Sequence, residues 1–274
     1  MLGKLIKNEI KFSAQSMLWI YSAVLVTIAV MGVSMLSDQV WLGAFAALAM
    51  IVLSMLLLAV TVFSILTNFN KTLYGNQGYL SFSLPVRSGS LLASKAIVAM
   101  LWLALSFVMF MGLMMGTSSF ISKIATEQMG EQNLEMIKMI IGMFKEMPST
   151  YTLVLYAVYL VITLFIFCFL IISAIFFAVT LANTRPFQKR ATLWIILFAL
   201  AEFFVLQNVY SQLMIRVPLS FFATPLGLEL RRQAVAGSGE LFGMGITGNL
   251  FYVAAAVCLI IGTSVLMKRK VNIR

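Results

Sequence analysis

Glu202 is the one acidic side chain inside the apolar stretches of this sequence. It lies about eleven residues into a predicted membrane helix, roughly 16 Å along the axis at 1.5 Å per residue. That depth is near the bilayer midplane, where a carboxylate is costly unless it faces water, has a partner or is protonated. Two interpretations follow: Glu202 lines or gates a route, or it is a buried acid hydrogen-bonded to a neighbouring helix. We expect Gln207 and Asn208, one to two turns further on, to extend a polar stripe toward the outside.

Residues that would support catalysis are missing from the sequence. The chain contains no histidine, which excludes a serine–histidine nucleophile pair and histidine-based metal sites. It has no G-x-x-x-x-G-K-[ST] phosphate loop, and Gly-Lys occurs only at Gly3-Lys4. Cys168 and Cys258 lie inside apolar runs, which favours packing over a disulfide or metal ligation. The sequence therefore predicts a chain that is not an enzyme and holds no metal or cofactor.

The composition is typical of a membrane protein. Hydrophobic residues make up 62% of the 274 positions and charged residues only 10%, whereas soluble domains carry about 25% charged residues. The net charge of +10 comes from cations at the ends of apolar runs. That distribution indicates membrane orientation and argues against a nucleic-acid partner. The first apolar run is long enough to span, so we expect a retained anchor and not a cleaved signal peptide.

Stretches of about 20 apolar residues are long enough to cross the bilayer as helices. The sequence therefore predicts an all-α integral membrane protein with a single transmembrane domain over 1–274. The six predicted spans are Ser16–Leu36, Val40–Thr67, Lys95–Gly116, Tyr151–Ala182, Ala191–Tyr210 and Ile246–Met267.

The charged residues outside the spans predict the orientation. One side would hold 13 of the 19 basic residues, and cytoplasmic loops are the ones enriched in Lys and Arg. Both termini are therefore expected in the cytoplasm. The basic side comprises Lys4, Lys7, Lys11, Lys71, Arg87, Lys95, Arg185, Lys189, Arg190, Lys268, Arg269, Lys270 and Arg274.

Four segments outside the spans have patterns of their own. Residues 1–15 form a predicted amphipathic helix on the membrane surface, in which Glu9 either snorkels or meets a partner subunit. Residues 68–94 form a predicted turn-rich cytoplasmic loop, with 88–94 as a possible start of the third span. Residues 117–150 have helical spacing and are expected outside. Residues 211–245 are external but too apolar for a solvated loop, so we expect a pair of re-entrant helices there.

The 68–94 loop carries a resemblance to a known family. Its run from Leu73 to Val86, LYGNQGYLSFSLPV, followed by Leu91-Leu92-Ala93-Ser94-Lys95, resembles permease subunits of ATP-binding-cassette exporters. The likeness is closest to the type-2 exporter permeases common in Gram-positive bacteria, several of which serve antimicrobial-peptide export or resistance. In layout it covers essentially the whole chain, and its specific part is this loop.

The resemblance implies a function in the bacterial plasma membrane. It implies that the loop holds a coupling helix docked on a separate ATPase subunit, present in two copies, which would bind the ATP and Mg²⁺. It also implies a second permease chain, identical or homologous. Family members often have an acid where this chain reads Asn76-Gln77, which leaves the strength of docking open. The coupling residues would be Tyr74, Gly75, Asn76, Gln77, Gly78, Tyr79, Leu80, Leu84 and Pro85.

Two other functions fit a chain of this kind. One is a non-transporting membrane anchor or sensor that uses the same loop to hold an ATPase. The other is an autonomous channel or secondary transporter, which would be expected to show several intramembrane ionisable groups or inverted repeats. The sequence shows a single such acid and no repeat.

Overall fold

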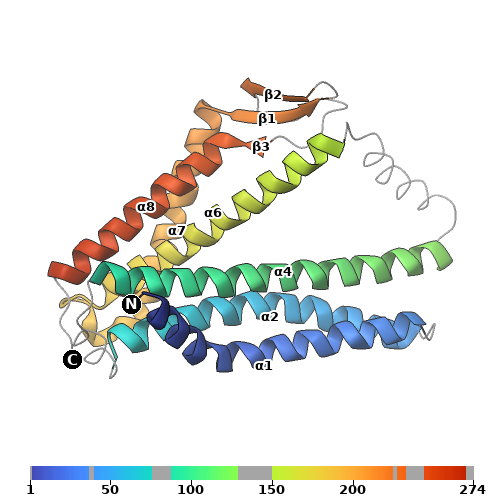
Figure 1. Cartoon of the computed structure of the whole chain (residues 1–274), viewed down its shortest axis with the longest axis horizontal. Helices are drawn as coiled ribbons and strands as arrows, with labels where there is room; N and C mark the ends of the chain where they lie inside the picture. The colour runs from blue at the N-terminus through green and yellow to red at the C-terminus, as the bar shows by residue number, and fades with distance from the viewer. Residues whose placement is uncertain are drawn as a thin grey trace. The chain divides into compact units, whose positions relative to one another are not determined.

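A computed structural model describes residues 2–36, 40–75, 88–128, 150–224, 227–232 and 244–269 (Figure 1). Helices dominate the described chain, and three short strands lie between the last two long helices. The elements are α1 (Leu2–Leu36), α2 (Val40–Leu73), α4 (Ser88–Gln128), α6 (Thr150–Ala182), the 3₁₀ helix η1 (Gln188–Arg190), α7 (Ala191–Arg216), β1 (Leu219–Thr224), β2 (Gly227–Arg232), β3 (Met244–Gly245) and α8 (Ile246–Arg269).

Six of the described helices are long and apolar enough to cross a membrane, which confirms the predicted number of spans. The chain is a multi-pass membrane protein by helix length and hydropathy. The apolar stretches within these helices are Met17–Ser34, Trp41–Leu73, Gly89–Ile121, Ala157–Ala182, Gln188–Arg216 and Ile246–Met267.

Several helices continue well past the predicted spans. The longest, α4, has 41 residues, about 60 Å at 1.5 Å per residue and twice the hydrocarbon thickness. Hydropathy marks where side chains tolerate lipid, whereas helical hydrogen bonds continue into the polar layer. The predicted 68–94 loop is consequently shorter than expected, because 68–73 belong to α2 and 88–94 to α4. Of the predicted external segment, 117–128 are helical in α4, and 129–149 lie outside the described residues.

The first fifteen residues are helical from Leu2 onward, as predicted, and join the first span without a break. Lys7 and Lys11 are exposed on the polar face, while Leu5 and Ile6 are half-buried. Ile10, which belongs to the predicted apolar face, is exposed as well, so the described side chains follow the amphipathic pattern only in part.

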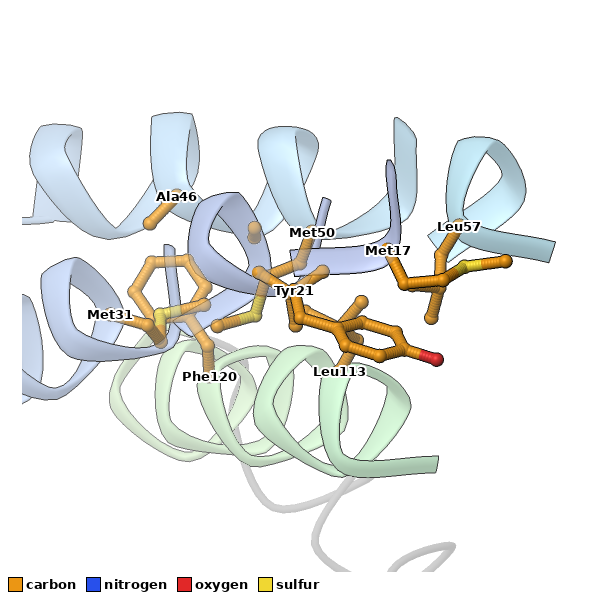
Figure 2. Close-up of a cluster of buried hydrophobic side chains, with 10 residues drawn as sticks. Met17, Tyr21, Met31, Ala46, Met50, Leu57, Leu113 and Phe120 are labelled. Atoms are coloured by element: carbon orange, nitrogen blue, oxygen red, sulfur yellow. The ribbon is translucent and has the colours of Figure 1, made fainter. Parts of the chain in front are cut away.

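The chain divides into two compact units. The second unit, made of Lys4–Ile65 and Leu101–Glu146, contains α1 and most of α2 and α4. Its core is a buried cluster rich in methionine to which all three helices contribute (Figure 2). Methionine fills irregular gaps between helices well because its side chain is unbranched and polarizable. The cluster comprises Met17, Tyr21, Val24, Met31, Ala46, Ala47, Met50, Leu57, Leu113 and Phe120.

Hydrogen bonds between helices accompany this core. The Tyr21 and Thr61 hydroxyls each lie within bonding distance of Ser106 Oγ, at 2.8 and 2.7 Å. Trp102 Nε1 donates to Ser13 Oγ at 2.8 Å. Polar groups in an apolar environment need such partners, and these bonds tie α1, α2 and α4 together.

The first unit, made of Met1–Gly3, Leu66–Met100 and Met147–Arg274, contains α6, α7, α8 and the strands. The strands form an antiparallel sheet of order β2-β1-β3 beside the ends of α7 and α8 (Figure 1). The predicted re-entrant helices at 211–245 are therefore wrong for the described residues: α7 runs to Arg216 and strands follow. Strand β1 pairs with β2 along its whole length and with β3 at two residues, so the backbone of this apolar segment finds partners in a sheet instead of a helix. Its period-two alternation is visible in Ser220 and Phe222, which are more buried than Phe221 between them.

Candidate functional site

The loop that the sequence singled out leaves α2 through a defined turn. The carbonyl of Asn70 accepts hydrogen bonds from the backbone N–H groups of Tyr74 and Gly75, at 2.9 and 3.0 Å. A Cβ atom at Gly75 would lie 2.8 Å from the carbonyl oxygen of Lys71. The chain therefore turns closely at the helix end, and glycine is the residue that fits there.

The side chain of Tyr74 runs from this turn to α6. Its hydroxyl donates to Thr180 Oγ1 at 3.0 Å, and the Thr180 hydroxyl donates in turn to the carbonyl of Phe176 at 2.7 Å. Burial raises the pKa of Tyr74 to about 12, so the phenol stays protonated and remains a donor at physiological pH. The two ends of α2 and α6 are thus joined by a buried hydroxyl chain.

Aromatic stacking reinforces the same contact. The rings of Phe69 and Phe176 stack with centroids 3.9 Å apart and planes 10° apart, and the ring of Tyr74 meets Phe69 edge-on at 6.1 Å. Such pairs contribute about 0.5–1.5 kcal/mol beyond their buried area. Asn183 adds a polar tie, since its Nδ2 donates to Asn70 Oδ1 at 3.1 Å.

Lys95 joins the start of α4 to the end of α2. Its ammonium donates to Thr72 Oγ1 at 2.7 Å, and only 5% of the residue is exposed. The sequence placed Lys95 among the cations of the cytoplasmic side, but its side chain is enclosed by the protein. Thr72 can accept this bond because its own hydroxyl proton goes to the carbonyl of Asn68 at 2.7 Å.

These contacts define one structure, which we call the loop base. It connects both flanks of the α2–α4 loop to each other and to α6. In the residues that the structure describes, no group of three or more His, Cys, Asp or Glu could hold a metal ion. What the arrangement offers is mechanical connection between three helices. The loop base comprises Phe69, Asn70, Thr72, Tyr74, Lys95, Phe176, Thr180 and Asn183.

Of the predicted coupling residues, Tyr74 belongs to the loop base and Gly75 forms the turn beside it, with its N–H bonded to the carbonyl of Asn70. No pattern in the sequence pointed to the α6 partners Thr180 and Asn183. Each ends an apolar run with a polar residue, but only tertiary structure pairs that run with α2. The other predicted coupling residues lie outside the described residues: Asn76, Gln77, Gly78, Tyr79, Leu80, Leu84 and Pro85.

Glu202 lies on α7, and both of its carboxylate oxygens are enclosed. Within the described residues neither oxygen has a hydrogen-bond partner, so the interpretation of a bonded structural acid gains no support there. Gln207 and Asn208 are exposed, and the Asn208 amide donates to the carbonyl of Phe204 in its own helix. At 100° per residue they lie about 140° and 120° around the helix from Glu202. The predicted polar stripe is therefore not formed.

Glu9 lies half-buried on α1, where its carbonyl accepts a hydrogen bond from Ser13 Oγ at 2.7 Å. A partner contact at Glu9 stays a prediction.

A scan against protein-family models, a search of curated proteins and a search of solved structures each found no match. The resemblance to exporter permeases rests on the residues alone and stays a prediction.

Proposed function

We propose that this chain is the membrane-spanning permease subunit of an ATP-driven exporter of the ATP-binding-cassette type. Two permease chains, identical or homologous, would form the route, and two ATPase subunits would dock on their cytoplasmic loops. The partner ATPase would bind ATP and Mg²⁺. The sequence resemblance suggests amphipathic substrates such as antimicrobial peptides.

The loop base is the observation that supports this proposal best. A loop that receives a displacement from a partner has to be attached stiffly to the helices it moves. Here one flank is bonded to α6 through Tyr74 and Thr180, and the other to α2 through Lys95 and Thr72. Buried, hydrogen-bonded contacts of this kind have few alternative arrangements. A push on the loop would therefore move α2, α4 and α6 together.

Glu202 supplies the proposed contact with the route. Its enclosed carboxylate lacks a partner within the described residues, and ionisable groups at membrane depth usually mark pathways or gates. In this proposal Glu202 gates or lines the route, while the loop base transmits the ATPase movement.

The test begins with purification of the chain from its native host in mild detergent. We expect an ATPase subunit to co-purify in stoichiometric amount. In proteoliposomes the complex should hydrolyse ATP and move a labelled amphipathic peptide. Replacing Gly78 and Tyr79 with alanine should lower transport-coupled ATP hydrolysis, while the melting temperature of the chain stays unchanged.

Two further variants separate the alternatives. Glu202→Gln should lower peptide flux while the ATPase still co-purifies, whereas a non-transporting anchor or sensor would show no flux to lose. Gly32→Ala serves as the control, because a Cβ there meets nothing within 4 Å. A chain that purifies alone in several mild detergents, and conducts or transports by itself, would contradict the proposal in favour of an autonomous channel or transporter.

A further inference from the structure

The linker between α6 and α7 gathers three cations within six residues. Arg185, Lys189 and Arg190 are all exposed. Among the residues that the structure describes, none of these three cations has an ion-pair partner. Within that part of the chain the linker therefore presents uncompensated positive charge.

The linker has a defined backbone conformation, because successive backbone hydrogen bonds stabilise its turns. Thr184 N–H donates to Leu181, Phe187 N–H to Thr184 and Arg190 N–H to Phe187, at 3.0–3.2 Å. The start of the linker is tied to α2 through the Asn183–Asn70 bond. The three cationic side chains therefore extend from a backbone whose conformation is held by hydrogen bonds.

Helix electrostatics does not explain all of these cations. Arg185 follows the C-terminus of α6, where positive charge is favourable, but Lys189 and Arg190 precede the N-terminus of α7, where it is unfavourable. Three like charges also repel one another over so short a segment. An external anion would relieve both penalties.

An aromatic cluster marks the level of the linker in the membrane. Phe187 lies 4.6 Å from Trp194 and 5.1 Å from Phe198, centroid to centroid, and Trp194 and Phe198 are half-buried. Tryptophan at the end of an apolar helix is typical of the headgroup layer. Exposed apolar side chains such as Leu193 and Ile196 lie on the first two turns of α7, between these rings. Cations, aromatic rings and exposed apolar side chains therefore lie close together in this short segment, as the headgroup and acyl chains of a phospholipid would require.

We propose that the 183–190 linker and the start of α7 form a binding site for anionic phospholipid. Arg185, Lys189 and Arg190 hold the phosphate headgroup, and the apolar face of α7 contacts the acyl chains. Lys71, exposed in the last turn of α2 next to Asn70, adds positive charge at the same end of the unit. The site does not depend on the proposed transport function, because it requires this chain alone.

Native mass spectrometry of the purified chain tests the site. Phosphatidylglycerol and phosphatidylcholine with identical acyl chains are titrated in neutral detergent. We expect the wild-type chain to bind phosphatidylglycerol at least about tenfold more tightly. The double variant Arg185→Gln/Arg190→Gln should weaken that binding about 30-fold, since each cation near anionic lipid contributes about 1 kcal/mol.

The matched control is Arg216→Gln/Arg232→Gln, which removes two exposed arginines at the sheet. It should leave phosphatidylglycerol affinity within about twofold of wild type, since screening confines charge effects to about 10 Å. Equal affinity for the two lipids, or equal losses in the two double variants, would overturn the proposal. So would displacement of the lipid by glycerol phosphate at equal concentration, which would indicate a simple anion site. The proposal would also be overturned if the wild-type chain showed no preference for phosphatidylglycerol and the arginine variants lost only the binding of a protein partner.

Discussion

At the scale of single residues, the Thr180 hydroxyl has two functions at once. It donates a hydrogen bond to the carbonyl of Phe176 and accepts a hydrogen bond from the hydroxyl of Tyr74. A hydroxyl has one donor and two acceptor sites, so both bonds are satisfied without competition. Thr263 in α8 is a close counterpart, fully buried and bonded to Leu259 of its own helix.

Replacing Thr180 with valine should show how much the hydrogen bond from Tyr74 contributes to the free energy of unfolding. The change preserves shape but leaves a buried phenol without its acceptor, which costs about 1–3 kcal/mol. Tyr74→Phe removes the hydroxyl altogether, so no buried donor is left without an acceptor. This variant should lose only about 1 kcal/mol of stability. Thermal and denaturant unfolding in detergent would measure these losses.

Thr263→Val is the control, since it removes only the bond within its helix. Because Tyr74 and Thr180 share one interaction, the double variant should lose less stability than the sum of the single variants. If Thr180→Val and Thr263→Val lose the same stability, the Tyr74 bond contributes nothing.

At the scale of elements, α2 and α4 approach closely in the second unit. A Cβ atom at Gly43 would overlap the ring of Phe120, which is buried in the methionine-rich cluster. Small residues let membrane helices approach in this way. Gly43 therefore determines how closely the two helices pack.

Gly43→Ala should destabilise the chain by about 1–3 kcal/mol, because the Phe120 ring has to move within a packed core. Gly32→Ala, which adds the same methyl group to open space, should change stability by no more than a few tenths, about the helix-propensity difference. Unfolding in mixed micelles would compare the two. Phe120→Leu should recover part of the loss in Gly43→Ala. Equal stability of the two alanine variants would show that the helices separate freely.

At the scale of the whole molecule, the distribution of charge predicts which side of the membrane each end faces. The linker cations belong to the predicted cytoplasmic side, and the sheet carrying Glu229 and Leu230 belongs to the predicted external side. Leu230 is 56% exposed, which makes it a suitable labelling position. Orientation is thus open to direct measurement.

The orientation predicts the labelling of two single-cysteine variants. In a Cys168→Ala/Cys258→Ala background, Leu230→Cys should react with a membrane-impermeant maleimide on intact cells. Lys189→Cys should react only after permeabilisation, because the orientation predicted from the charges places position 189 on the cytoplasmic side. The two positions serve as controls for each other. The reverse pattern would place the termini outside and contradict docking of a cytoplasmic ATPase at the α2–α4 loop.

Local pattern was sufficient for much of the fold. Six helical spans follow from apolar length, because a backbone in lipid has to satisfy itself. The helical start of α4 at Ser88 and the helix in the first fifteen residues were also predicted from the sequence. The prediction of re-entrant helices after α7 was wrong, because apolar residues interrupted by proline are compatible with a broken helix and with a hairpin alike. Only the pairing of Phe222 with Glu229 and of Phe221 with Met244 distinguishes them.

The sequence by itself determined that the chain is a multi-pass helical membrane protein, and it singled out Tyr74, Gly75 and Glu202 as residues to follow. Hydropathy is a local property, so a single sequence is enough to read it. The long-range contacts of the loop base were decided only by tertiary structure. Thr180 meets Tyr74, and Asn183 meets Asn70, across separations of more than one hundred residues. Helices of equal apolarity can pack in many pairs, and the pair that forms depends on side-chain fit and on partners for buried polar groups.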